Sequence, residues 1–168
     1  MSEAGDILGE GRLAREALAR ANIHPETGLA TDYLNHFNEV VMLMDMLSDM
    51  PECAEDMLAW EPCGYVEHFR RSSFAARDLA IAAYGAAPKA VRAHLETIVL
   101  QIDAEVARAQ SLLRAGASRA VLAEIARLAD EDIRPLISAA SGAIHGRIDG
   151  AEPEEGASAQ ADIDALFG

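Results

Sequence analysis

The longest stretch of this chain without proline or glycine runs from residue 89 to residue 115, between Pro88 and Gly116. Proline and glycine are the residues that disfavour a helix interior most strongly, so this stretch predicts one long helix. Alanine and leucine are abundant elsewhere, and aromatic residues make up only 5% of the chain. No alternating β-branched run lies between hairpin-type turns. The sequence therefore predicts an all-α fold, in the form of a helical bundle.

Start and stop signals divide the rest of the chain into further helices. Thr27 and Thr31 can each cap a helix that ends before Pro51. Ser118 is the expected N-cap of the last helix, which Pro135 is expected to kink. The expected helices span residues 10–21, 27 or 31 to 49, 51–60, 65–72, 75–86, 88–115 and 118–143. Because 51% of the 168 residues are hydrophobic, we expect them to share one core and form a single domain over residues 1–148.

The second expected helix has two faces of different character. On a helical wheel, its core face holds Tyr33, Phe37, Val40, Met44 and Leu47. A neighbouring and more exposed strip holds Asp32, Asn35, Glu39 and Met46. Met42 and Met46 lie away from the core face, where flexible apolar side chains suit either a partner protein or the protein's own third helix.

The balance of charge argues against two classes of partner. The chain has 14 basic and 28 acidic residues, which give a net charge of −14. Such a charge repels nucleic-acid phosphates and anionic lipid, so we expect neither nucleic acid nor membrane as a partner. The chain also lacks a long uninterrupted apolar run and a basic start followed by an apolar segment, so we expect a cytoplasmic protein.

Familiar metal and enzyme motifs are missing from the sequence. None of the 5 histidines follows a glutamate by three residues, the spacing that a carboxylate-bridged di-metal bundle requires. The chain also lacks GxGxxG, P-loop, GxSxG and HExxH patterns. Cys53 and Cys63 do not form a CxxC pair, and we expect both to be buried thiols. We therefore expect no metal site and no cofactor of the protein's own.

The composition changes near residue 149. Residues 149–159 are acidic, contain proline and glycine and have no large apolar side chain, which is typical of a flexible linker. Residues 160–168 then form a short amphipathic segment, in which Ile163, Leu166 and Phe167 share one face of a helix. An apolar face at the end of a linker predicts a docking helix for a partner.

This tail resembles the peptides that bind response regulators in bacterial chemotaxis. Gln160, Asp162, Ile163, Asp164, Ala165 and Leu166 match the pattern of the N-terminal peptide of the flagellar switch protein FliM, and Phe167 resembles the C-terminal end of the phosphatase CheZ. The resemblance implies that the partner is a CheY-like receiver domain of a bacterial two-component pathway. The expected partner-binding residues are Gln160, Asp162, Ile163, Asp164, Leu166 and Phe167 in the tail, with Glu39, Met42 and Met46 on the body.

A second resemblance concerns Asp32-Tyr33-Leu34-Asn35. This spacing is similar to the acid-x-x-Asn pair of the CheC/CheX-type response-regulator phosphatases. It implies that Asn35 positions a water for attack on the phosphoaspartate and that Asp32 pairs with the receiver's lysine. The receiver would supply the Mg²⁺. A simpler explanation is that Asp32 stabilises the positive end of a helix and Asn35 is an ordinary surface residue.

Other functions stay open at this point. A non-enzymatic adaptor in motility or two-component signalling would need the tail but not Asn35. A histidine phosphotransfer-like protein would use His36, which lies at the border of the core face. A tail that folds back on its own domain would make the protein independent of any receiver. The alanine-rich faces of the two long helices are also compatible with a homodimer.

Overall fold

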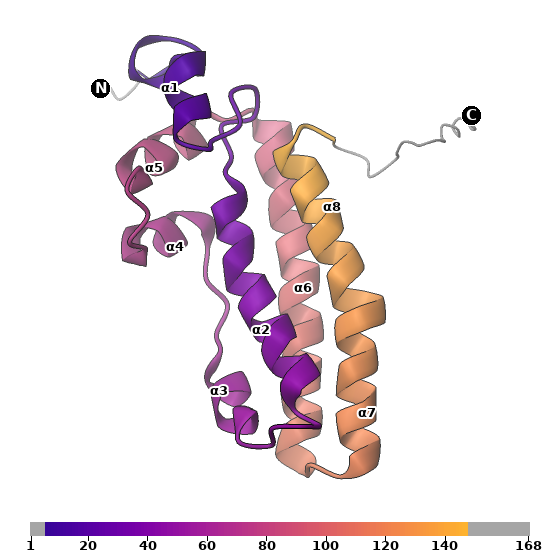
Figure 1. The fold of residues 1–168 in the computed structure, drawn as a ribbon. Helices are drawn as coiled ribbons and strands as arrows, with labels where there is room; N and C mark the ends of the chain where they lie inside the picture. Colours follow the sequence, from indigo (N-terminus) through magenta and orange to yellow (C-terminus); the bar gives the residue numbers. More distant parts are fainter. Residues whose placement is uncertain (1–5, 148–168) are drawn as a thin grey trace, which may run out of the picture.

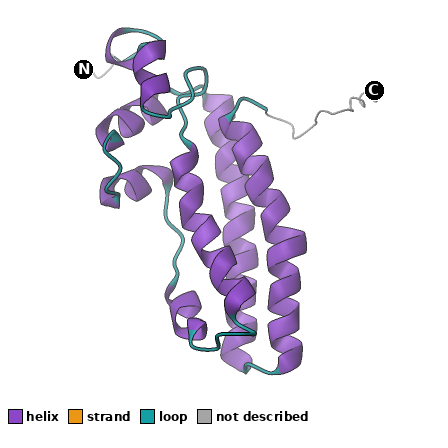
Figure 2. Cartoon of the chain, in the orientation of Figure 1, coloured by secondary structure: helices purple, strands orange, loops and turns teal. Residues whose placement is uncertain are grey.

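The computed structural model describes residues 6–147, and its regular elements are helical. The α-helices are α1 (Arg15–Arg20), α2 (Asn35–Met46), α3 (Cys53–Ala59), α4 (Tyr65–Arg71), α5 (Arg77–Ala86), α6 (Lys89–Ala115), α7 (Arg119–Arg127) and α8 (Arg134–Ile144). The 3-10 helices η1 (Gly11–Leu13) and η2 (Thr31–Leu34) precede α1 and α2, and the π-helical η3 (Leu128–Ile133) joins α7 to α8. Residues 6–147 contain no β-strand (Figure 2), so the all-α prediction is confirmed.

Three long columns form the body of the molecule (Figure 1). They are α2, α6 and the continuous rod made of α7, η3 and α8. The rod runs back along α6, and the contact between α6 and α8 is the most extensive between any two elements. Helices α1, α4 and α5 gather near the start of α2, whereas α3 lies beside its end. The start of α2 therefore lies at the same end of the bundle as the end of α8.

The core follows the helical periodicity that the sequence predicts. The expected core face of α2 is buried, since Tyr33, Phe37, Val40, Met44 and Leu47 are each at most 2% exposed. On α6 the buried residues recur every three or four positions, as Val91, Leu95, Ile98, Ile102, Val106, Ala109 and Leu113. This spacing places one stripe of each long helix against the others.

The second helix begins differently from the expectation. Residues 31–34 form the 3-10 helix η2, and α2 starts only at Asn35 and ends at Met46. Thr31 does not cap it, because the N-cap of η2 is Ala30, which makes no side-chain hydrogen bond. Thr27 has another role: its buried hydroxyl donates to the Ile144 carbonyl at 2.6 Å. The threonine thus ties the loop before η2 to the end of α8.

The first expected helix is also interrupted. Residues 10–21 form η1 and α1 rather than one helix, because Ala14 between them has an extended backbone. Helix α1 ends at Arg20, one residue before the expected end, and Asn22 adopts a left-handed conformation with φ of 62°. Asparagine tolerates that conformation better than most residues, so it can turn the chain sharply after α1.

The last expected helix contains a π-helical turn just before Pro135, where a kink was expected. Ser118 caps α7 as predicted, since its side chain accepts from the Val121 amide at 3.1 Å. The π-helical η3 lies just before Pro135, which occupies the first turn of α8. Proline cannot donate to the carbonyl four residues back and its ring needs space there, so a wider turn accommodates it.

The two cysteines differ in their surroundings. Cys53 is buried as expected, but Cys63 is only partly buried because it lies in the loop between α3 and α4. Both are free thiols. Among residues 6–147, every helix is too short or too polar to cross a membrane.

Candidate functional site

The loop between α1 and η2 forms one wall of the candidate site. A single antiparallel bridge joins Ile23 to Ala30, and the His24 amide donates to the Leu29 carbonyl at 2.8 Å. At the tip of the loop, Gly28 has φ of +74° and lies so close to α5 that a Cβ atom would be 2.8 Å from the Ala83 carbonyl oxygen. Only glycine satisfies both conditions without strain, so the loop can pack closely against α5.

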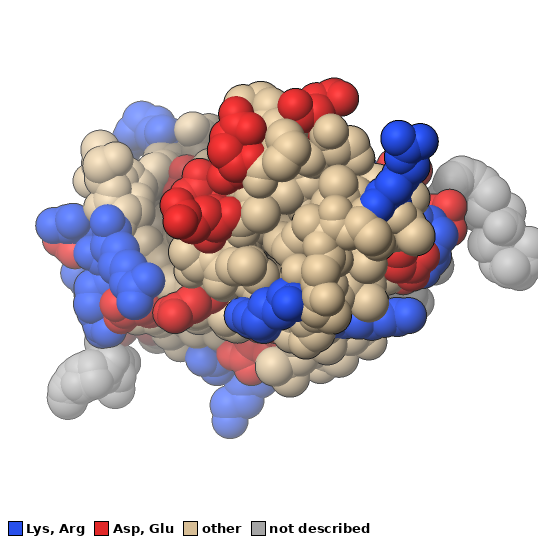
Figure 3. Space-filling view, turned by 90° about the horizontal axis from the view of Figure 1, so that it is seen from below, with Lys and Arg blue, Asp and Glu red and all other residues tan. Residues whose placement is uncertain are grey.

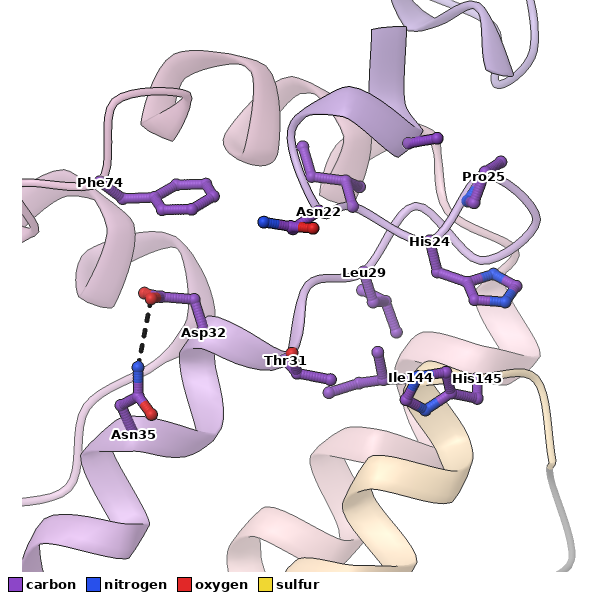
Figure 4. A pocket seen from close by; sticks show the side chains of 12 residues that line it. Asn22, His24, Pro25, Leu29, Thr31, Asp32, Asn35, Phe74, Ile144 and His145 are labelled. Carbon is purple, nitrogen blue, oxygen red and sulfur yellow. Dashed lines mark hydrogen bonds between the residues drawn. The ribbon is translucent and has the colours of Figure 1, made fainter. Parts of the chain in front are cut away.

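This loop, η2 and the end of α8 surround an open pocket of about 460 Å³, here called the polar pocket (Figure 4). Its polar side chains come from segments far apart in the sequence. They include Asn22, His24, Asp32, Asn35 and His145, and apolar contributions come from Leu29, Phe74 and Ile144. The structure therefore brings both predicted catalytic residues to one cavity, next to the last turn of α8.

Asp32 and Asn35 contact each other directly. The Asn35 side-chain amide donates to Asp32 Oδ1 at 3.2 Å (Figure 4). The 3-10 turn of η2 and the first turn of α2 set this geometry, since both residues belong to consecutive turns of one helical segment. Asn35 is exposed, and its carbonyl oxygen points away from Asp32. An oriented amide at the edge of a cavity can accept a hydrogen bond from a bound water.

His68 is the second partner of Asp32. Its Nε2 donates to Asp32 Oδ2 at 3.0 Å, and the two side chains are only 15% and 30% exposed. The His68 ring packs edge-on against Tyr33 and Phe69, with centroid distances of 5.5 and 4.9 Å. Helix α4 thus holds one oxygen of the Asp32 carboxylate, and Asn35 holds the other. Sequence reasoning missed this histidine, because no local pattern links positions that are 36 residues apart.

His36, the candidate for phosphotransfer, is held by a hydrogen bond and by a stacking contact. Its Nε2 donates to the Glu61 carbonyl at 2.8 Å, and its ring stacks on Trp60 at a centroid distance of 4.6 Å. Because a carbonyl only accepts, Nε2 carries the proton in this hydrogen bond, and Nδ1 is then the unprotonated ring nitrogen. Burial is the main factor that lowers the pKa of His36. The geometry is that of a packed, hydrogen-bonded histidine.

The expected partner-binding residues of α2 are not equally accessible. Glu39 is exposed, and Met42 is 57% exposed. Met46 is only partly exposed and packs against the core. Helix α2 ends at Met46, and the side chain of this methionine packs against the core where the chain continues toward α3. Of the three partner-binding residues predicted on the body, Glu39 and Met42 are thus the accessible ones.

Charges on the body are largely arranged in local pairs. Arg70 and Arg71 both contact Glu67, at 3.4 and 2.9 Å. Figure 3 views the end of the bundle opposite the polar pocket, where acidic and basic side chains surround an uncharged centre. The face in this view is not a continuous acidic surface, despite the net charge of −14.

The part of the chain that the structure describes does not gather three or more histidine, cysteine, aspartate or glutamate side chains into a metal site. The linker and the docking residues of the tail, from Gln160 to Phe167, lie outside the described residues. Comparisons with family models, with curated proteins and with solved structures found no match to this chain.

Proposed function

We propose that this protein binds a CheY-like receiver domain through residues 160–168 and acts on its phosphoaspartate through Asp32 and Asn35. One spatial relationship carries the proposal. Ile144 and His145 line the same polar pocket as Asp32 and Asn35, and the chain continues from there toward the tail. A receiver held by the tail would therefore be tethered beside the acid-amide pair.

The length of the predicted linker suits this arrangement. The predicted linker, residues 149–159, has eleven residues, and as a flexible chain it would have a root-mean-square span of about 18 Å and a maximum reach of about 38 Å. A receiver of ordinary domain size has a radius of gyration of about 13 Å. The tethered receiver could therefore place its phosphorylation site over the polar pocket. The effective concentration would reach about a millimolar, so a weak catalytic contact would suffice.

The proposed chemistry uses few groups because the receiver supplies the rest. Asn35 would hold a water in line with phosphorus, and Asp32 would accept a hydrogen bond from the receiver's lysine. A carboxylate has about four acceptor positions, and Asn35 and His68 use two of them. Asp32 can therefore contact the lysine while His68 continues to hold it. The Mg²⁺ would belong to the receiver, not to this protein.

A non-enzymatic adaptor is the second candidate. The hydrogen bond from Asn35 to Asp32 is a contact within one helical segment, and such a contact stabilises the junction of η2 and α2 without any partner. In an adaptor the tail alone would bind the receiver. The two candidates differ in whether the loss of the Asn35 amide changes the lifetime of the phosphoaspartate.

Binding to a phosphorylated CheY-type receiver from the source organism tests the shared part of both candidates. We expect an affinity in the micromolar range or weaker, because ordering a short peptide offsets much of the apolar contact. The full chain should bind, and Phe167→Ala should weaken binding about tenfold through loss of one buried aromatic contact. Ser158→Ala in the linker is the matched control and should bind like the wild type.

The thermal stability of a chain that lacks residues 160–168 separates a docking tail from a folded-back tail. An unchanged Tm is expected if the tail is a tethered peptide. A clear fall in Tm, together with no receiver binding by the full chain, would overturn the proposal. That result would indicate that the tail packs on its own domain.

A further inference from the structure

A second pocket, distinct from the polar pocket, lies between α4, α5 and α6 and is here called the tyrosine pocket. Its volume is about 410 Å³, and the residues relevant here are Tyr33, Tyr65, Tyr84, Glu96, Leu100 and Asp103. The rings of Tyr65 and Tyr84 are stacked with centroids 4.5 Å apart, and Tyr33 lies 5.1 Å from Tyr65. Leu100 is 69% exposed, so an apolar side chain borders the pocket at the surface. A cavity of this size suits a small molecule.

Two tyrosine hydroxyls of the pocket donate to acceptors within the protein. The Tyr33 hydroxyl donates to the Cys63 carbonyl at 2.7 Å, and the Tyr84 hydroxyl donates to Glu96. By contrast, Asp103 Oδ1 is buried and has no hydrogen-bond partner among residues 6–147. A buried carboxylate oxygen without a partner is costly, so its presence calls for an explanation.

The composition of the walls indicates what kind of group would satisfy Asp103. Two carboxylates in one pocket favour a positive charge, and tyrosine rings attract cations at their faces. The Tyr84 ring is already in contact with the Arg92 guanidinium, 5.6 Å from its centroid, and with the stacked Tyr65 ring, so a ligand cation would depend mainly on Asp103 and the other rings. The remaining walls are mainly apolar, which favours an organic cation over a hydrated metal ion.

We propose that the tyrosine pocket binds a small organic ammonium compound, with its charged head against Asp103 and the tyrosine rings. This site is separate from the proposed receiver function, because neither Asp32 nor Asn35 lines it. Burial raises the pKa of Asp103 from 3.8 to about 6 in the free protein, which agrees with a carboxylate that lacks a partner. A bound cation would remove that penalty.

Calorimetric titration of the full chain with choline tests the proposal, and 3,3-dimethylbutan-1-ol serves as a neutral compound of the same shape. We expect choline to bind at millimolar concentrations and the neutral alcohol to bind at least about tenfold more weakly. Equal affinity for the two compounds would overturn the proposal, because it would show an apolar cavity without charge selectivity. Absence of choline binding up to about 50 mM would also overturn it.

Two variants on α6 locate the site. Asp103→Asn should weaken choline binding about tenfold, because an amide of nearly the same shape carries no charge. Glu105→Gln is the matched control, since this acid lies on the same helix but does not line the pocket. A Tm of Asp103→Asn at or above that of the wild type shows that the variant is folded. Unchanged choline affinity in the folded Asp103→Asn protein would contradict the assignment.

The pH dependence of binding provides an independent readout. Choline keeps its charge at all pH values, whereas Asp103 loses its proton as the pH rises through about 6. Affinity should therefore rise about tenfold between about pH 5 and about pH 8. The other titratable groups that line the pocket are Tyr33, Cys63, Tyr65, Tyr84 and Glu96. An affinity that stays constant over this range would count against Asp103 as the binding group.

Discussion

Two aspartates in neighbouring pockets of this protein have opposite environments. Asp32, in the polar pocket, receives hydrogen bonds from Asn35 and His68 on its two oxygens. Asp103, in the tyrosine pocket, has one buried oxygen without a partner in the described residues. The Asp32 carboxylate is oriented by side chains of the protein, whereas the Asp103 carboxylate can be satisfied by a ligand in the tyrosine pocket. The two pockets are therefore suited to different roles.

A carboxylate can be prepared for function in two ways. A carboxylate held by two donors keeps a fixed direction, which suits the positioning of a partner's cation in a short-lived complex. A carboxylate without donors is destabilised until a ligand arrives, which suits a binding pocket. Adjacent residues of η2 supply both pockets, because Asp32 lines one and Tyr33 lines the other.

The largest effect on stability should come from Gly28→Ala, because this change disturbs the walls of both pockets. Alanine would have to adopt φ of +74° with its Cβ 2.8 Å from the Ala83 carbonyl, next to Tyr84. We expect a loss of about 2–4 kcal/mol in the free energy of unfolding, measured by denaturant titration. Gly9→Ala is the control, since Gly9 has φ of +92° but no atom within 4 Å of the added Cβ. A similar loss in both variants would show that backbone strain alone, not packing against α5, limits this position.

His68→Ala should have the next largest effect, since it removes one donor from Asp32 and packing from Tyr33. We expect a loss of about 1–3 kcal/mol in the free energy of unfolding, because Asp32 Oδ2 loses its partner. In the background of Asp32→Asn the same histidine change should cost less, and the difference measures the coupling between the two side chains. Equal costs in both backgrounds would mean that His68 acts through packing alone.

Asp103→Asn should have a smaller effect of the opposite sign. The pKa of Asp103 in the folded protein is about 6, which is above its ordinary value of 3.8. At pH values between these two numbers, the folded protein therefore binds more protons than the unfolded chain. Stability is therefore lost as the pH rises through this range, and the asparagine variant avoids that loss. We expect the variant to be about 1 kcal/mol more stable at about pH 8, a value reduced for solvent screening, and equal to the wild type near pH 4. Lower stability of the variant at the higher pH would contradict the absence of a partner for Asp103.

The smallest effect on folding is expected for Asn35→Ala. Asn35 is exposed, and the loss of its bond to Asp32 should change the free energy of unfolding by about 0.5 kcal/mol or less. Asn38→Ala, at another exposed position of α2, provides the comparison by thermal denaturation. A loss well above that of Asn38→Ala would assign Asn35 a structural role at the start of α2.

Periodic parts of the chain could be predicted from the sequence. The core face of α2, the extent of α6 and the cap at Ser118 follow from local rules that depend on neighbouring residues only. The proximity of Asp32 and Asn35 was predictable for the same reason, since one turn of helix separates them. These features need no knowledge of distant contacts.

The features that complete the two pockets were not predictable in this way. His68 reaches Asp32 from α4, and Thr27 reaches Ile144 across 117 positions of sequence. The loop around Gly28 has no periodic pattern, and its shape depends on the surface of α5. Contacts of this kind arise when helices pack, so periodicity carries no signal for them. The same applies to Asp103, whose Oδ1 atom is seen to lack a partner among residues 6–147 only once the chain is folded.

The rate of phosphate loss from a phosphorylated CheY-type receiver of the source organism tests the central claim most directly. The rate would be measured with the wild-type protein, with Asn35→Ala and with Asn38→Ala as the matched control. The account predicts that the wild type and Asn38→Ala accelerate the loss, whereas Asn35→Ala binds the receiver but lowers the acceleration by about 100-fold, the usual contribution of a positioned catalytic group. Equal acceleration by Asn35→Ala and Asn38→Ala, or no acceleration by the wild type, would contradict it.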